Sequence, residues 1–179
     1  MKTLYLLRHA KSSWKDADLD DFDRPLKGRG RRAGEAMGLH LAEKGRIPDL
    51  VLCSTARRTV ETLDLLSPHL GGTTACDLTA DLYGAGAGSI LGLVARQDDH
   101  LKAIMVIGHN PGLETLAREL TGGGRVALRR TLEDKFPTGA LAVLTADVDH
   151  WKDLRPGGAK LKDFVRPVDL DTDLAGGRA

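Results

Sequence analysis

Short apolar runs alternate along the chain with segments of helical periodicity. Four of the runs are each long enough for one buried strand. They are Thr3–Leu7, Asp49–Cys53, Lys102–Ile107 and Ala140–Leu144. Two weaker runs, Ala75–Leu78 and Leu161–Val165, predict further strands. The pattern therefore predicts at least four strands, separated in sequence by other elements.

The intervals after the first two strong runs predict helices. Residues Leu26 to Lys44 carry apolar side chains near helical spacing, and Gly45 is placed to end that helix in a left-handed cap. Arg57 to Leu66 predicts a second helix, for which Ser54 is the expected N-cap. The residues between the first strand and the first helix have no clear period and predict a long loop.

The second half of the chain continues the alternation. An amphipathic helix is expected to begin at Ile90–Ala95. Asn110 and Pro111 predict an N-cap and a first helical residue, and that helix continues to Leu120. Gly122–Gly124 is expected to break the chain.

Alternating strands and helices predict an α/β fold of three layers, α/β/α, around a mostly parallel sheet. The length of 179 residues fits one domain with a real core. We expect that domain to span residues 1–168. The polar, glycine-containing stretch 169–179 is expected to form a flexible tail.

Composition narrows the classes of partner. The 26 basic and 25 acidic residues leave a net charge of +1, which gives no bulk attraction to nucleic acid or to an anionic membrane. No apolar stretch approaches membrane-spanning length, and the start of the chain lacks the pattern of a signal peptide. The two cysteines, Cys53 and Cys76, predict neither a disulfide framework nor a thiolate metal site, so a cytoplasmic location is expected.

Cationic and imidazole side chains follow three of the predicted strands. The first strand ends in Arg8-His9, the second is followed by Arg57 and Arg58, and the third ends at His109, just before a predicted helix. If these strands are parallel neighbours, the side chains meet at one rim together with a helix N-terminus. Arginine forks and helix N-termini both favour phosphate, and histidine can act as a nucleophile or proton carrier.

This constellation resembles the histidine phosphatase superfamily, also called phosphoglycerate mutase-like. The resemblance covers residues 3–167 and rests on four motifs in family order. They are Arg8-His9-Ala10, a shortened stretch from Asp23-Arg24-Pro25-Leu26 to Gly30, Ser54-Thr55-Ala56-Arg57-Arg58-Thr59-Val60-Glu61-Thr62, and Gly108-His109-Asn110-Pro111. The short chain, the Gly-His-Asn-Pro-Gly form and Phe136-Pro137-Thr138-Gly139-Ala140 are most similar to small bacterial phosphohistidine phosphatases.

The resemblance implies a mechanism and a set of residues. His9 is expected to attack phosphorus and to become transiently phosphorylated, while Arg8, Arg58 and His109 hold the phosphate oxygens. The family register selects Arg58 as the site arginine, with Arg57 as the alternative. Lys15 and Asn110 are expected to contact phosphate or to serve local structure. No metal and no cofactor are expected.

The resemblance leaves the general acid and the substrate open. Asp81 is the one carboxylate near the position where many members of the family carry an acid, and a loop or cap role is its alternative. A phosphorylated imidazole leaves easily without such an acid, so a phosphohistidine protein is the favoured substrate. The alternatives are a broad small-molecule phosphomonoesterase and a module that binds phosphate with little turnover. The sequence identifies neither the physiological partner nor the oligomeric state.

Overall fold

A computed structural model describes residues 1–170 of the chain. Its strands are β1 (Lys2–Arg8), β2 (Leu50–Ser54), β3 (Ala75–Thr79), β4 (Ala103–Gly108), β5 (Thr121–Gly124), β6 (Leu141–Ala146) and β7 (Ala159–Val165). Its α-helices are α1 (Gly28–Glu43), α2 (Arg57–Leu66), α3 (Ala87–Ala95), α4 (Gly112–Leu120) and α5 (Val126–Asp134). Five short 3₁₀ turns complete the described elements: η1 (Asp21–Asp23), η2 (Ser67–His69), η3 (Ala80–Leu82), η4 (Trp151–Asp153) and η5 (Pro167–Asp169).

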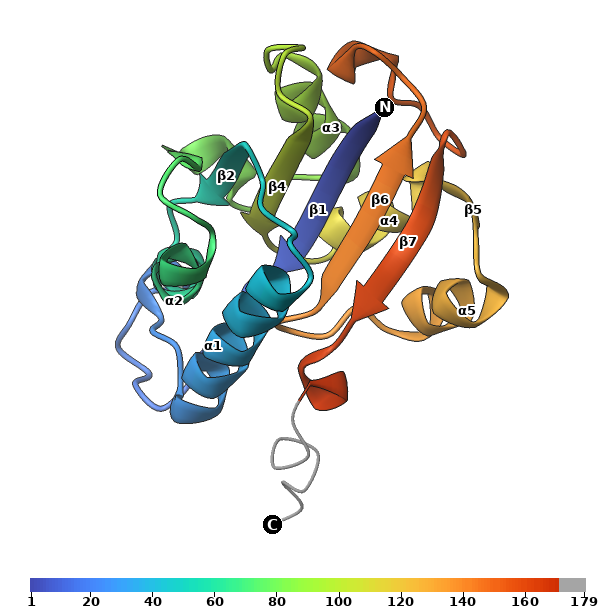
Figure 1. The fold of residues 1–179 in the computed structure, drawn as a ribbon. Helices are drawn as coiled ribbons and strands as arrows, with labels where there is room; N and C mark the ends of the chain where they lie inside the picture. The colour runs from blue at the N-terminus through green and yellow to red at the C-terminus, as the bar shows by residue number, and fades with distance from the viewer. Residues whose placement is uncertain (171–179) are drawn as a thin grey trace.

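The strands form one sheet in the order β3-β2-β4-β1-β6-β7-β5 (Figure 1). Pairing is parallel between β3 and β2, β2 and β4, β4 and β1, and β7 and β5, whereas β6 runs antiparallel to both of its neighbours. The predicted mostly parallel α/β fold is confirmed. The three strands expected to share chemistry, β2, β4 and β1, are consecutive and parallel, so their carboxyl ends lie at the same edge.

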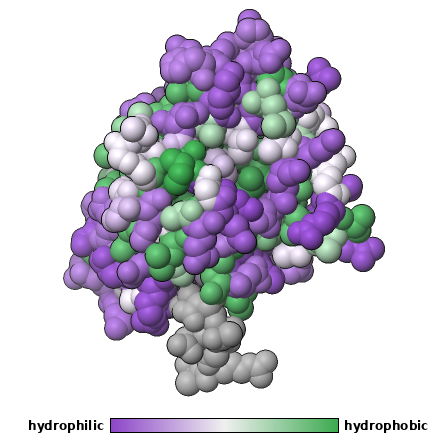
Figure 2. Space-filling view, in the orientation of Figure 1, coloured by the Kyte–Doolittle hydropathy of each residue, from purple (hydrophilic) through white to green (hydrophobic). Residues whose placement is uncertain are grey.

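Helices cover both faces of the sheet, as the apolar character of its strands requires. Leu4 and Leu6 of β1 pack in a core cluster with residues of α3, α4 and α5. Tyr5 and Leu7 face the opposite side and pack with residues of α1 and α2. Figure 2 shows mainly hydrophilic residues on the outside of one face, with hydrophobic residues scattered among them.

Several predicted details differ in the structure. Gly122–Gly124 does not break the chain but forms most of β5, whose backbone pairs with β7. The prediction that Ser54 caps α2 is wrong, because Ser54 is still part of β2 and Ala56 occupies the cap position. Helix α4 begins two residues after Asn110, with Pro111 at the cap position. Gly45 has a φ of 61°, which confirms the predicted left-handed end of α1.

The last described residues lie at the boundary between the predicted domain and its predicted tail. Asp169 belongs to η5 and hydrogen-bonds the Arg166 side chain and backbone, and Leu170 packs against the core. The rest of the predicted tail, 171–179, lies outside the described residues. Within residues 1–170, no helix is both long enough and apolar enough to cross a membrane.

Candidate active site

A cavity of about 310 Å³ opens at the edge where β1, β4 and β2 end. Arg8 pairs in register with Gly108, and the backbone N–H of His9 donates to the Gly108 carbonyl, so the two histidine-bearing strand ends are held together. The cavity is lined by Arg8, His9, Lys11, Ser12, Trp14, Asp21, Arg24, Arg58, His109, Asn110 and Thr138. The structure thus brings five of the six predicted site residues to one cavity.

His9 is held as a neutral imidazole with one free nitrogen. Its Nδ1 lies 2.8 Å from the Ala10 carbonyl oxygen. A carbonyl can only accept, so Nδ1 carries the proton and Nε2 keeps its lone pair. Burial lowers the pKa of His9 to about 3, and the positive charges of Arg58 and Arg8 add to the effect. At neutral pH the imidazole is therefore uncharged, with an unprotonated and nucleophilic Nε2.

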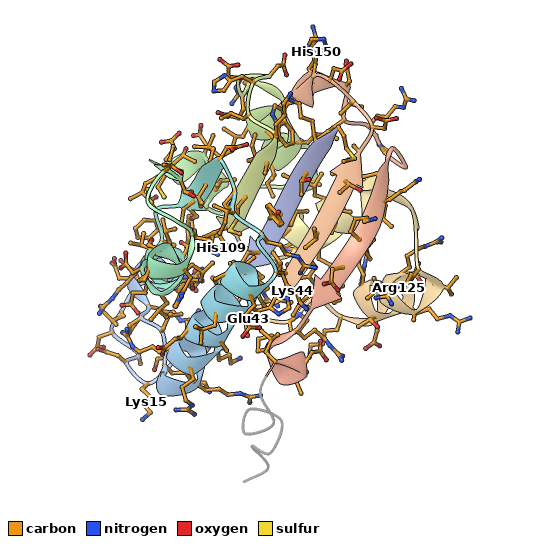
Figure 3. The ribbon with its side chains drawn as sticks, viewed as in Figure 1. Lys15, Glu43, Lys44, His109, Arg125 and His150 are labelled. Atoms are coloured by element: carbon orange, nitrogen blue, oxygen red, sulfur yellow. The ribbon has the colours of Figure 1, made fainter. Side chains whose placement is uncertain are left out.

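His109 lies beside His9, with the two ring centroids 5.3 Å apart. Its Nδ1 is 3.3 Å from an Arg58 guanidinium nitrogen, which can only donate, and its Nε2 is 2.9 Å from the Ser54 hydroxyl oxygen. The proton of the neutral ring is therefore on Nε2, which donates to Ser54. Burial and the Arg58 charge lower the pKa of His109 to about 4. Figure 3 shows His109 near the C-terminal end of β1.

Arg8 is anchored from the second half of the chain. Its guanidinium donates to the Phe136 carbonyl at 2.9 Å, and the Asn110 amide nitrogen donates to the same oxygen at 3.0 Å. The backbone N–H of Gly139 donates to the carbonyls of both Arg8 and His9. Within the described residues the buried Nε of Arg8 has no hydrogen-bond partner. Buried donors of this kind are uncommon and are often explained by a ligand or water.

Sequence reasoning missed the carboxylate of the cavity, Asp21. Its oxygens accept hydrogen bonds from Arg24 at 2.6 Å, from Arg58 at 2.9 Å and from the Tyr83 hydroxyl at 2.9 Å. Burial alone would raise its pKa, but these partners outweigh that effect and bring the pKa to about 2. Asp21 is therefore a permanent anion that orients Arg58. The segment that carries Asp21 has no hydrophobic periodicity. The one sequence signal for its ion pair with Arg24 is the separation of three positions between them.

Two other sequence candidates lie away from the cavity. Lys15 is exposed at the outer end of the loop between β1 and α1, far from His109 in Figure 3. Asp81 lies in η3, where its backbone N–H donates to the Thr79 hydroxyl, and it lines a different surface hollow beside α3. Arg57 is exposed and ion-paired with Glu61, whereas Arg58 is only 6% exposed and reaches the cavity. The geometry thus favours Arg58 over Arg57.

The donors at the cavity suit an anion. Among residues 1–170, no three His, Cys, Asp or Glu side chains are grouped as they would be around a metal ion. The cavity wall instead combines four basic side chains, Lys11, Arg8, Arg24 and Arg58, with the single carboxylate of Asp21.

The buried histidines predict a pH dependence of stability. Their pKa values fall from 6.5 in a model peptide to about 3 and about 4 in the fold. Between these limits the unfolded chain binds more protons, so the free energy of unfolding should decrease as the pH falls below 6.5. The slope should approach about 1.4 kcal/mol per pH unit for each histidine. Asp21 loses its contribution only as the pH falls below about 3.8, which is outside the range from pH 7 to pH 5.

Urea unfolding at pH 7, 6 and 5 measures this slope. His9→Gln should remove the share of His9, up to about 1.4 kcal/mol per pH unit. His100→Gln removes a surface histidine that pairs with Asp98, and as the control it should change the slope by much less than His9→Gln does. A wild-type stability that is constant from pH 6.5 to pH 5 would contradict the assignment of two buried neutral histidines.

Comparison with known proteins agrees with this geometry. Residues 4–100 match the model of the histidine phosphatase superfamily, branch 1. An uncharacterized protein of Mycobacterium tuberculosis is 38% identical over 90% of this chain and 99% of its own length. Two solved structures cover 93% of the chain with a TM-score of 0.79, one from Agrobacterium tumefaciens (31% identical, 98% of that chain) and one from Nakamurella multipartitia (32%, 96%). Both are described as candidates for the phosphohistidine phosphatase SixA. The chain belongs to the histidine phosphatase superfamily.

Proposed function

We propose that the protein is a phosphatase that passes the phosphoryl group of its substrate first to His9 and then to water, and that its substrate is phosphohistidine in a protein. The observation that carries the proposal is the state of His9. Its Nδ1 is committed to the Ala10 carbonyl, and its Nε2 is left unprotonated in a cavity with Arg8, Arg58 and His109.

In the first step the Nε2 lone pair forms a bond to phosphorus while the bond from phosphorus to the leaving group breaks. The leaving atom takes that electron pair. Charge on the equatorial oxygens is stabilised by the guanidinium groups of Arg8 and Arg58, which are already oriented by Phe136 and Asp21. The approach of the phosphate charge also favours a proton on His109, whose ring then becomes a third cationic donor beside Arg8 and Arg58.

In the second step a water oxygen attacks phosphorus and the bond to Nε2 breaks. The electron pair returns to Nε2, and the water gives up its proton to solvent or phosphate. His9 is regenerated as the neutral imidazole that the Ala10 carbonyl orients.

The state of the acids in the cavity supports a leaving group that departs easily. Asp21 has a pKa of about 2, so it holds no proton to donate at neutral pH. Asp81 lines another hollow. A phosphorylated imidazole departs without strong general acid catalysis, whereas an alkyl alcohol needs it. The two SixA-like structures above 30% identity support the same substrate class.

A trapping experiment tests the proposal. The protein is mixed with a ³²P-labelled phosphohistidine protein or with p-nitrophenyl phosphate, quenched in alkali within milliseconds, and digested for peptide mapping. We expect an acid-labile, alkali-stable label on the peptide that contains His9, and faster turnover of the phosphohistidine protein. Tight phosphate binding without label would favour a binding module. Faster turnover of p-nitrophenyl phosphate would favour a broad phosphomonoesterase.

The domain bounds and the location stay predictions. We propose that residues 1–168 act as one catalytic domain, since both strands that pair with β1 within residues 1–170 come from later in the chain. The cytoplasmic location rests on the cysteine content alone.

A further inference from the structure

The aromatic residues of this chain are unevenly placed. It has two Trp, two Tyr and three Phe. Tyr5, Phe136, Phe164 and Trp151 are buried in the core. The other three, Trp14, Phe22 and Tyr83, lie on segments around the catalytic cavity: Trp14 lines it, and Tyr83 packs edge-on against both Phe22 and His109. Packing in the hydrophobic core explains the four buried aromatic residues. It does not explain the three aromatic residues around the cavity.

Trp14 lines the cavity and is the most exposed large hydrophobic residue in the described part of the chain, with 73% of its surface accessible. Its indole lies against the Arg24 guanidinium, 3.2 Å from the ring centroid. Arg24 is itself only 6% exposed. The indole therefore has one face on a fixed cation and the rest of its surface open.

Arg24 gives this indole a rigid support. Its Nε donates to the Ser13 carbonyl at 2.9 Å, and its two terminal nitrogens donate to the Asp21 carboxylate at 2.6 Å and to the Ser12 hydroxyl at 2.7 Å. The loop is tied to the start of α1 by a bridge between Ser12 and Leu26. A stacking surface that is already ordered loses little conformational entropy when a ring binds to it.

We propose that Trp14, supported by Arg24, is a leaving-group subsite that takes a planar aromatic ring, and we infer that this ring is the imidazole of the phosphohistidine substrate. The inference rests on the proposed function. His9, Arg8 and His109 lie at the ends of β1 and β4, whereas Ser12, Trp14 and Arg24 line the same cavity from the segment between β1 and α1. In-line displacement requires the leaving group to lie opposite the attacking Nε2, and in our proposal the wall supplied by this segment receives it.

A matched pair of substrates isolates the ring. N-phosphoimidazole and phosphoramidate both carry a P–N bond, but only the first has an aromatic leaving group. Trp14→Ala should lower kcat/KM for N-phosphoimidazole by about 10-fold and that for phosphoramidate by less than about 2-fold, as expected for the loss of one stacking contact. Trp14→Phe should keep most of the preference. Leu39→Ala, at an exposed apolar position on α1, is the control and should change neither value.

Fluorescence supplies a readout that does not depend on turnover. Trp14 and the buried Trp151 are the only two tryptophans. Phenylphosphonate, which cannot be hydrolysed, should change the emission of the wild-type protein, whereas methylphosphonate should not. Trp14→Phe, in which only Trp151 emits, should respond to neither.

The outcomes separate this inference from the proposed function. Equal losses for both P–N substrates in Trp14→Ala would mean that the indole only shields Arg24, and would overturn the subsite. An unchanged emission with bound phenylphosphonate would overturn it as well. Both results leave the phosphoenzyme on His9 intact. Failure of the wild-type protein to form that phosphoenzyme would instead overturn the proposed function.

Discussion

Replacing His9 by glutamine should lower the turnover of phosphohistidine or N-phosphoimidazole by about 10⁴-fold or more, the usual result of losing a covalent nucleophile. The amide of glutamine has no nitrogen lone pair able to attack phosphorus. The change leaves Arg8, Arg58 and Asp21 in place, so inorganic phosphate should still bind. Phosphate release measures the first effect, and isothermal titration with phosphate measures the second.

The same variant should also lose the alkali-stable label on the peptide that carries residue 9. Circular dichroism establishes that it remains folded, and His100→Gln controls for the removal of a histidine elsewhere. Turnover of His9→Gln within 10-fold of wild type, a difference of about 1.4 kcal/mol in activation free energy, would exclude a phosphohistidine intermediate at this position.

A second large loss of activity is expected on replacing Arg58, and the neighbouring Arg57 provides the matched control. Arg57 and Arg58 are neighbours in the first turn of α2, but only Arg58 lines the cavity. Arg58→Ala should lower kcat/KM by about 10³-fold, because a preorganised guanidinium that stabilises transition-state charge is lost. Arg57→Ala removes an exposed ion pair with Glu61 and should change kcat/KM by less than about 2-fold.

Arg58→Lys distinguishes charge from geometry. Arg58 donates to the backbone carbonyl and the carboxylate of Asp21 and also faces His109, an arrangement that needs the planar fork. Lysine should therefore restore little of the lost activity. If Arg57→Ala proved as damaging as Arg58→Ala, the register of the second motif would have to move by one residue.

Strands that bury side chains on both faces of the sheet could be predicted from the sequence. Strands without such buried side chains could not. The strands β1, β2, β4 and β6 are recognisable as continuous apolar runs, because helices cover both faces of each strand. β5 is nearly all glycine and is held by backbone pairing to β7, so no side-chain pattern marks it. Helix α5 was missed for a related reason, since Leu132 is its only fully buried residue.

The candidate site divides in the same way. Residues that directly follow an apolar strand, such as His9 and His109, could be located because the sheet determines where strands end. Asp21, Arg24 and Trp14 belong to an aperiodic loop, and their positions depend on how that loop folds back onto the strand ends. The Phe136 carbonyl that anchors Arg8 could not be found from residue types at all, since every residue has a carbonyl.

The central position of β1 has a consequence for synthesis of the chain. Within residues 1–170, β1 pairs with β4 and β6 alone, and because these begin at Ala103 and Leu141, His9 is synthesised long before the partners of its strand. A nascent chain that ends before those strands has no partner for either edge of β1, no Gly108 carbonyl for His9 and no Phe136 carbonyl for Arg8. Its imidazole is solvated and titrates as in a peptide. We therefore expect the candidate site to assemble only after the chain has been synthesised through β6.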